Sequence, residues 1–179
     1  MSSVLLSISG HDRAGIVRDV AEALLHIDVN IEDSSMTALR GRFTMMLIVN
    51  LPEDRAIGEL KAALAELEQR TRLTVQSQVI SDEEATAAAS EPDHVITVHG
   101  ADKAGIVYAV TDALATLGVS VVDVSTQSRG SDQSSSNVYM MVLEVVAGDQ
   151  GDAMRVTLND VANSIGVDVD LHVLDDAVL

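Results

Sequence analysis

The hydrophobic pattern of the first eighty residues changes between two periods, the two-residue period of strands and the 3.6-residue period of helices. Positions 2–9 alternate weakly and are rich in β-forming residues, which predicts a strand. Apolar residues then recur at helical spacing, and an Arg40-Gly41 pair between two strand-like runs predicts a tight turn and a hairpin. The pattern predicts the order strand, helix, strand, strand, helix, strand, with elements at 2–9, 15–27, 29–39, 43–51, 56–70 and 73–79. The first helix is expected to bury one stripe, made of Ile16, Val17, Val20, Leu24 and Ile27.

The same pattern occurs a second time in the chain. The run Gly10-His-Asp-Arg-Ala-Gly-Ile-Val17 matches Gly100-Ala-Asp-Lys-Ala-Gly-Ile-Val107 at an offset of 90. The offset is then expected to grow to 95, which pairs Thr44 with Tyr139 and places the additional residues in a Gly- and Ser-rich loop at 130–137. A period of about ninety residues is too long for a solenoid repeat and indicates two complete small domains. The second copy is expected to bury Ile106, Val107, Val110, Leu114 and Leu117 on one helix and Met154, Leu158, Val161 and Ile165 on the other.

Each copy has the βαββαβ order of a ferredoxin-like sandwich, in which two helices cover one face of a four-stranded antiparallel sheet. The expected fold class is therefore α+β, with two such domains at 1–80 and 93–179. The segment 81–92 is acidic, has no apolar periodicity and ends at Pro92, so it is predicted to be the linker. The strand at 43–51 is apolar on both faces. Since one helix layer covers only one face, we hypothesise that the two copies pack together.

Charge and composition narrow the functions that remain. The 179 residues carry 11 basic and 28 acidic side chains, a net charge of −17, and 2% of them are aromatic. Nucleic-acid binding is not expected, because it relies on clustered Lys and Arg and on stacking aromatic rings. The absence of cysteine excludes disulfides, thiolate catalysis and cysteine-held zinc. No stretch approaches the ~20 apolar residues of a membrane span, so we expect a cytoplasmic protein without membrane contact. The five histidines do not cluster, and the spacing of His94 and His99 predicts opposite faces of one strand, so we expect no metal. No nucleotide-binding motif occurs, and we expect no cofactor.

The segment between the first strand and the first helix is the candidate site in both copies. Glycines permit a tight turn and a close approach, and free backbone N–H groups at a helix start attract a small carboxylate. Asp12 and Asp102 can accept hydrogen bonds from an ammonium group, so an amino acid would satisfy both halves of the site. The alternative role for these two aspartates is structural, as caps of the following helices.

The Gly-x-Asp-Arg-Ala-Gly-Ile-Val motif, followed by Val29-Asn-Ile-Glu-Asp33 and Phe43-Thr-Met-Met46, resembles the ACT domain. Two such domains in tandem are similar to the glycine cleavage system transcriptional repressor family. The resemblance implies regulatory modules that bind amino acids, usually at the interface of two copies, with glycine or serine as the favoured ligand. It implies a ligand site in the first copy made of His11, Asp12, Arg13, Ala14, Gly15, Ile16 and Asn30. In the second copy the implied residues are Asp102, Lys103, Ala104, Gly105, Ile106 and Ser120.

The second copy departs from this pattern, since Ser120 stands where the first copy has Asn30 and Ala101 where it has His11. An amide both donates and accepts hydrogen bonds, so the first copy is expected to bind the amino acid more tightly than the second copy does. The resemblance implies a non-enzymatic regulator that forms homo-oligomers and acts by contact with a regulator or enzyme protein. One alternative is a ligand-free scaffold that oligomerises through its apolar sheet faces. Another is an enzyme related to formyltetrahydrofolate deformylases or phosphoserine phosphatases, although no residues remain for a catalytic domain.

Overall fold

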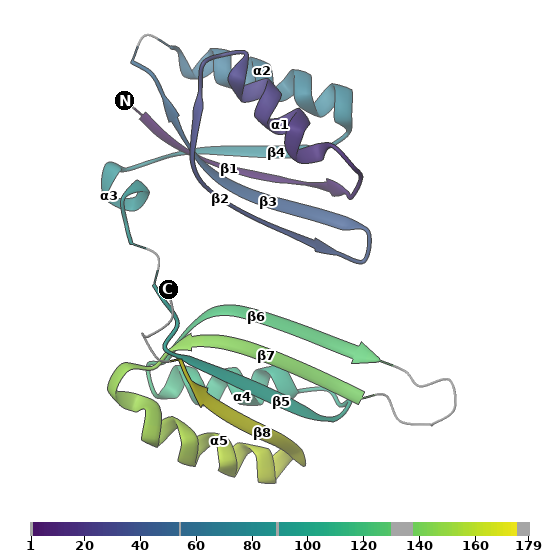
Figure 1. The fold of residues 1–179 in the computed structure, drawn as a ribbon, viewed down its shortest axis with the longest axis vertical. Helices are drawn as coiled ribbons and strands as arrows, with labels where there is room; N and C mark the ends of the chain where they lie inside the picture. The colour runs from purple at the N-terminus through teal and green to yellow at the C-terminus, as the bar shows by residue number, and fades with distance from the viewer. Residues whose placement is uncertain (1, 54, 89, 130–137, 175–179) are drawn as a thin grey trace. The chain divides into compact units, whose positions relative to one another are not determined.

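The chain forms two units, each with its own hydrophobic core (Figure 1). The computed structural model describes residues 2–53, 55–88, 90–129 and 138–174. Contacts divide the chain after Ala88, inside the segment 81–92 that the sequence predicts to be the linker. The domain limits of 1–80 and 93–179 stay predictions. Each unit is described by itself below.

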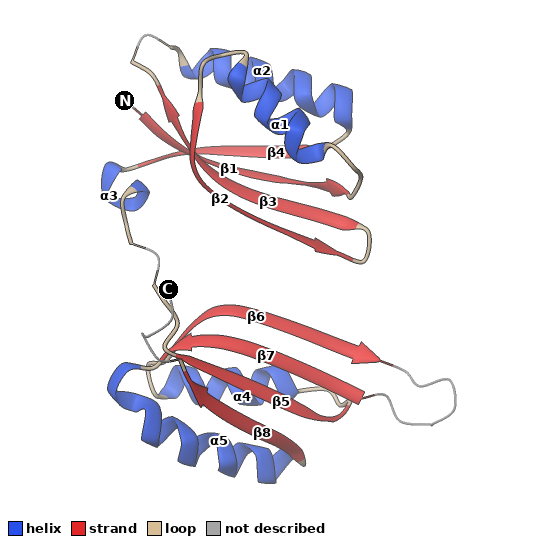
Figure 2. Cartoon of the chain, viewed as in Figure 1, coloured by secondary structure: helices blue, strands red, loops and turns tan. Residues whose placement is uncertain are grey.

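The first unit is built from four strands and two long helices in βαββαβ order. These are β1 (Ser2–His11), α1 (Ile16–Leu25), β2 (Asn30–Leu39), β3 (Arg42–Leu51), α2 (Ile57–Thr71) and β4 (Thr74–Ile80). The strands form one antiparallel sheet in the order β2-β3-β1-β4. Both helices lie on the same face of this sheet (Figure 2).

The second unit repeats this arrangement. Its elements are β5 (His94–Ala101), α4 (Ile106–Thr116), β6 (Ser120–Arg129), β7 (Val138–Val146), α5 (Gly151–Ile165) and β8 (Val167–Val173). The sheet order is β6-β7-β5-β8, and both helices again cover one face (Figure 2). The predicted fold class, α+β with two ferredoxin-like sandwiches, is confirmed. The loop predicted at 130–137 lies outside the described residues.

One short helix, α3 (Asp82–Ala85), lies in the segment between the long elements of the two units. Ser81 and Glu84 hold it by a reciprocal capping box. The Ser81 Oγ accepts from the Glu84 N–H at 3.2 Å, and the Glu84 carboxylate accepts from the Ser81 N–H at 2.8 Å. None of its residues is buried. Local hydrogen bonds therefore stabilise this helical turn, although its residues have no apolar pattern and bury no side chain.

The turn between β2 and β3 has the geometry that the sequence predicts. Arg40 and Gly41 both have positive φ, at 48° and 76°. Two consecutive left-handed residues match the twist of the flanking strands, as in a type I′ hairpin turn. The predicted hairpin is confirmed.

The buried stripe of each first helix is narrower than predicted. Ile16, Val20 and Leu24 are at most 2% exposed, but Val17 is 44% exposed. Val17 lies about 100° around the helix from Ile16, so it faces away from the sheet. Val107 in the second copy is also 44% exposed. The prediction that Val17 and Val107 belong to the core is therefore wrong.

The sheet face that the helices leave open carries apolar side chains, as the strand pattern predicts. Along β3, Met45 and Leu47 are buried, whereas Met46 between them is 54% exposed. In β7, Met141 is buried and Met140 is 43% exposed. Packing of the two copies through these open faces stays a prediction.

The two copies align differently from the prediction in their third strand. Gly10 pairs with Phe43 in the first sheet, and Gly100 pairs with Tyr139 in the second. Phe43 and Tyr139 are therefore equivalent, at an offset of 96. The predicted pairing of Thr44 with Tyr139 is wrong by one residue. Because a one-residue shift exchanges the two faces of a strand, this correction places Tyr139 on the helix-covered side of its sheet.

Candidate functional site

Each candidate loop ends in a glycine whose backbone is left-handed. Gly15 has a φ of 86° and Gly105 a φ of 94°, directly before α1 and α4. L side chains rarely adopt this conformation, so glycine is what allows the strand to turn into the helix. Neither helix has a side-chain cap. The first-turn N–H groups therefore remain available to solvent or to a ligand.

The two loop aspartates do not cap these helices. The backbone N–H of Asp12 donates to the Gly41 carbonyl at 2.9 Å, which ties the loop to the β2–β3 turn. The carboxylate of Asp102 accepts from the Ser128 hydroxyl of β6 at 2.6 Å. Both aspartates are exposed. The capping role is therefore wrong, and both carboxylates can face a ligand.

A buried aspartate distinguishes the first copy. Asp19 of α1 is 6% exposed and accepts from Arg13 and from Arg18, each at 2.6 Å. The hydrogen bonds from Arg18 and Arg13 lower the pKa of Asp19. The Arg18 guanidinium lies 3.9 Å from the place that a Cβ on Gly15 would occupy. The two guanidinium groups therefore lie beside the start of α1.

The sequence prediction does not include this cluster. One feature of the sequence could have revealed the cluster. Asp19 stands directly before Val20 of the buried stripe, and Arg18 stands directly before Asp19. An acidic side chain next to a buried stripe needs a cationic partner, and the chain offers two within six residues.

The second copy has no equivalent ion pair among its described residues. Tyr108 and Ala109 stand where the first copy has Arg18 and Asp19. No atom lies within 4 Å of a Cβ placed on Gly105. The start of α4 is therefore open.

A hollow of about 410 Å³ lies at this open helix start. Tyr139 is its most buried aromatic side chain, at 8% exposed, and the Tyr139 hydroxyl donates to the Met141 sulfur at 3.7 Å. Burial and, to a smaller extent, the Asp102 carboxylate raise the pKa of Tyr139. Asp102 accepts from Ser128, and Ser128 pairs with Tyr139 across β6 and β7. The hollow is lined by Lys103, Gly105, Ile106, Val107, Tyr108 and Tyr139.

The structure separates residues that the resemblance places in one site. His11 ends β1, whereas Asn30 begins β2 opposite Asn50, which itself pairs with Ser3 near the start of β1. At about 3.3 Å per residue, the two ends of this sheet are roughly 25 Å apart. Ser120 takes the equivalent place in the second sheet. One unit therefore cannot present both its loop and this position to the same small ligand.

Basic side chains gather at the loop end of the first unit. The β1–α1 loop, the β2–β3 turn and the α2–β4 turn meet there, because His11 pairs with Arg42 and Ser9 with Thr74 (Figure 1). We call this surface the arginine end; it comprises Arg13, Arg18, Arg40, Arg42 and Arg72. The first two are paired with Asp19. The other three are exposed and form no ion pair within the described part of the chain.

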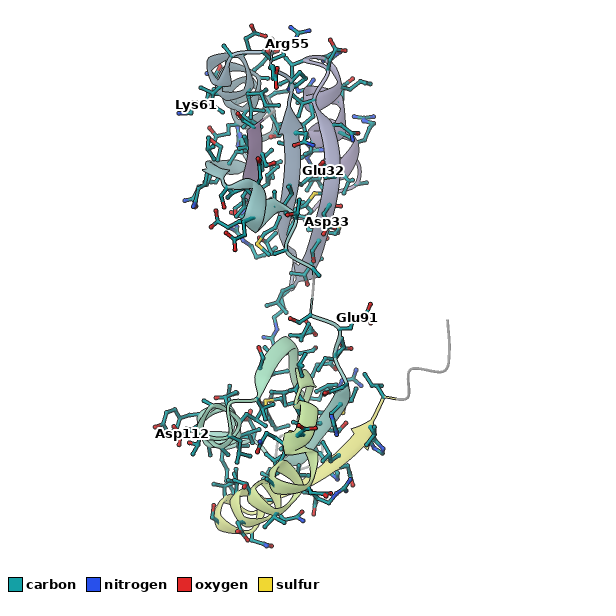
Figure 3. The ribbon with its side chains drawn as sticks, turned by 90° about the vertical axis from the view of Figure 1, so that its left-hand side faces the viewer. Glu32, Asp33, Arg55, Lys61, Glu91 and Asp112 are labelled. Atoms are coloured by element: carbon teal, nitrogen blue, oxygen red, sulfur yellow. The ribbon has the colours of Figure 1, made fainter. Side chains whose placement is uncertain are left out.

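The opposite end of the first unit is acidic. Glu32 and Asp33 lie on β2 after its first residues (Figure 3). Glu32 accepts a hydrogen bond from the Asn50 side chain, and Asp33 accepts from the Ser34 N–H at 2.7 Å. The charges of this unit are therefore separated along its strands, with the candidate loop at the positive end.

The described residues show no metal site and no membrane helix. His94 is buried on the helix-covered face of its sheet, while His99 is exposed on the other face, as their spacing predicts. No group of three or more His, Asp or Glu side chains in the described ranges could hold a metal ion. Among the same residues, no helix combines the length and the apolar composition that crossing a membrane requires.

The fold and the glycine-started helices define each unit as a ferredoxin-like module with an open loop at one end of its sheet. The ACT domain family model matches residues 2–78 and 93–172. The chain therefore belongs to the ACT domain family and carries two such domains, as the sequence motifs predict.

Relatives of known sequence match the chain over one domain's length. The UPF0237 protein MK1213 of Methanopyrus kandleri is 38% identical over 65 residues, which are 36% of this chain and 72% of the relative. The UPF0237 protein DIP1286 of Corynebacterium diphtheriae is 33% identical over 81 residues, which are 44% of this chain and 91% of the relative.

Two solved structures match the tandem arrangement over nearly the whole chain. A structure described as an unknown protein from Galdieria sulphuraria has a TM-score of 0.79 and 28% identity, and the match covers 97% of this chain and 99% of the other. A candidate glycine cleavage system transcriptional repressor has a TM-score of 0.73 and 18% identity, with 98% of each chain covered. The second likeness shows a shared fold.

Proposed function

We propose that this protein is a non-enzymatic regulator that senses an amino acid through its ACT domains. One observation, present in both copies, carries the proposal: a left-handed glycine opens onto a helix start that has no side-chain cap. Backbone N–H groups and the helix dipole favour an anion there. The exposed carboxylates of Asp12 and Asp102 lie in the same loops and favour an ammonium group. The two charges of an amino acid match this pair of features.

We infer that the loop and Asn30 contact one ligand only when they come from different ACT domains. The separation of roughly 25 Å within one sheet supports this inference. It favours an oligomer in which the amino acid bridges two domains and shifts the population of their arrangements. Glycine or serine is the ligand we propose for the first copy, because Arg13 and Arg18 occupy the space beside Gly15.

Contact with a protein partner is the second part of the proposal. Three arginines of the arginine end are unpaired among the described residues, in a chain of net charge −17. An acidic patch on a protein can match these arginines locally, whereas a phosphate backbone carries negative charge along its whole length and is repelled by the rest of this chain. The likeness to a candidate glycine cleavage system transcriptional repressor supports control of amino-acid metabolism, or of its transcription, by such contact.

Calorimetric titration of the full chain with each of the twenty amino acids, beginning with glycine and serine, tests the proposal. We expect micromolar binding by one or two of them. Gly15→Val is expected to weaken that binding at least about tenfold, because a side chain there blocks the approach of the carboxylate. Asn30→Ala is expected to weaken it as well, since it removes a hydrogen-bonding amide.

Gly118→Val is the matched control for backbone strain. Gly118 also has a positive φ, 71°, and no atom lies within 4 Å of the place that a Cβ would occupy, but it follows α4 at the end away from the loop. Equal effects of Gly15→Val and Gly118→Val would show that strain, and not the site, weakens binding. If none of the twenty amino acids binds, the ligand-free scaffold is favoured. Turnover of formyltetrahydrofolate or phosphoserine would contradict a non-enzymatic role.

A further inference from the structure

We infer that the hollow beside α4 binds an amino acid with an apolar side chain, so that the two copies recognise different ligands. This inference rests on the proposed function, because it names the ligand class of one of its two sites. The groups that carry it are Lys103, Val107, Tyr108 and Tyr139. Asp102 lies next to them through its hydrogen bond with Ser128, the residue that pairs with Tyr139.

Side chains around the hollow present apolar surface that a ligand can cover. Tyr108 is 72% exposed and Val107 is 44% exposed, and both lie in the first turn of α4. Tyr139 adds a buried ring as a third wall. A hollow of about 410 Å³ is in the size range of small-molecule sites, and tyrosine rings provide large contact areas in such sites.

Opposite charges flank these apolar walls. The Lys103 ammonium makes one long hydrogen bond within the described residues, to the Ile165 carbonyl at 3.4 Å, so it can pair with a ligand carboxylate. The Asp102 carboxylate is held by Ser128 at 2.6 Å and lies close enough to Tyr139 to raise its pKa. It can accept from a ligand ammonium group. The hollow thus offers a partner to each part of an amino acid that has an apolar side chain.

The first copy lacks this combination. Arg18 replaces the exposed tyrosine, and its guanidinium is bound to Asp19 at 2.6 Å and lies over Gly15. A charged guanidinium therefore lies next to Gly15, whereas no atom lies within 4 Å of the equivalent point beside Gly105. Glycine and serine have no apolar side chain to place against Tyr108, so the second site favours larger ligands.

Tyrosine fluorescence reports on this hollow, because Tyr108 and Tyr139 are the two tyrosines of a chain that has no tryptophan. Titration of the full chain with L-leucine, a non-fluorescent probe, is expected to change the fluorescence in a saturable way. Calorimetry is expected to give an affinity for L-leucine at the second copy at least about tenfold tighter than that for glycine. Glycine is expected to leave the fluorescence unchanged, even where it binds the first copy.

Variants at one helix position separate the two copies. Tyr108→Ala is expected to weaken L-leucine binding about tenfold, because it removes the exposed wall of the hollow. Tyr108→Phe keeps the ring and is expected to keep the affinity. Arg18→Ala alters the equivalent position of the first copy and is expected to leave L-leucine binding unchanged. Tyr108 is exposed, so these changes spare the core.

Two results would overturn the inference and leave the proposed function standing. One is L-leucine binding that Tyr108→Ala does not weaken. The other is a chain that does not bind L-leucine but binds glycine or serine, with Gly15→Val abolishing the binding of glycine or serine. If no amino acid binds the chain, both the inference and the proposed function are overturned.

Discussion

Replacing Leu47 by alanine is expected to lower the free energy of unfolding by about 3 kcal/mol. Leu47 is 1% exposed on β3, where it pairs with Leu6 of β1 and Ser34 of β2. Its removal loses the transfer free energy of the side chain and leaves a cavity in a close-packed interior that relaxes only in part. Urea unfolding followed by far-ultraviolet circular dichroism measures the change.

Met46→Ala is the matched control for Leu47→Ala. Met46 is the next residue on the same strand, but it lies on the open face and is 54% exposed. We expect its replacement to cost less than about 1 kcal/mol. Equal losses in the two variants would contradict the burial pattern of β3. The mass of the particles in solution, measured at several protein concentrations, reports self-association. Weaker self-association of Met46→Ala than of the wild type would support packing of another copy on this face.

Replacing Asp93 by alanine is expected to destabilise the second unit by about 1–2 kcal/mol. The Asp93 carboxylate accepts from the N–H groups of Ala147 at 2.8 Å and Gly148 at 2.7 Å, and from His94 Nδ1 at 2.7 Å. It thereby joins the start of β5 to the end of β7. Burial raises the pKa of Asp93, but the hydrogen bonds from His94, Ala147 and Gly148 outweigh it and lower the pKa from 3.8 to about 2. Because 35% of the side chain stays exposed, water screens part of this stabilisation.

The stabilisation from Asp93 is expected to disappear in acid. Its folded pKa is below its unfolded pKa, so the contribution is complete above about pH 4 and declines as the pH falls through about 2. Both tyrosines lie in the second unit, so tyrosine fluorescence follows its unfolding across this range. The difference between the wild type and Asp93→Ala should shrink over the same interval.

Asp112→Ala is the control for the acid profile. Asp112 is an exposed carboxylate on α4 (Figure 3). Its replacement is expected to change the stability little at any pH. A difference between the wild type and Asp93→Ala that persists undiminished below about pH 2 would contradict the role of the ionised Asp93 carboxylate.

Local patterns were sufficient to predict most of the fold. The Arg40-Gly41 pair specified a hairpin because the turn itself requires consecutive residues with positive φ. Helical and strand periods specified the order of elements, since each element buries one side. The glycine before each first helix marked the candidate loops, because few other residues adopt that backbone conformation.

Other features depended on contacts between distant segments. Periodicity placed Val17 in the core, but Val17 lies about 100° around α1 from Ile16, and contact with the sheet covers only the side of Ile16. The segment 130–137 carries no apolar pattern, so the sequence could not show that the offset of the third strand is 96. Asn30 follows the first helix closely in sequence, yet α1 runs along the sheet from Gly15 and so places Asn30 at the opposite end of the sheet.

The sequence by itself determined the ACT family, the duplication and the α+β fold, and it pointed to the candidate loops before the first helix of each copy. These features reside in short motifs and periods, which neighbouring residues specify together. Only the tertiary structure decided that arginines bound to Asp19 lie beside the first loop, while Tyr108 and Tyr139 line a hollow beside the second. Tyr139 is thirty-one residues away from Tyr108, so their meeting depends on the register of β7 against β5, which local sequence does not specify.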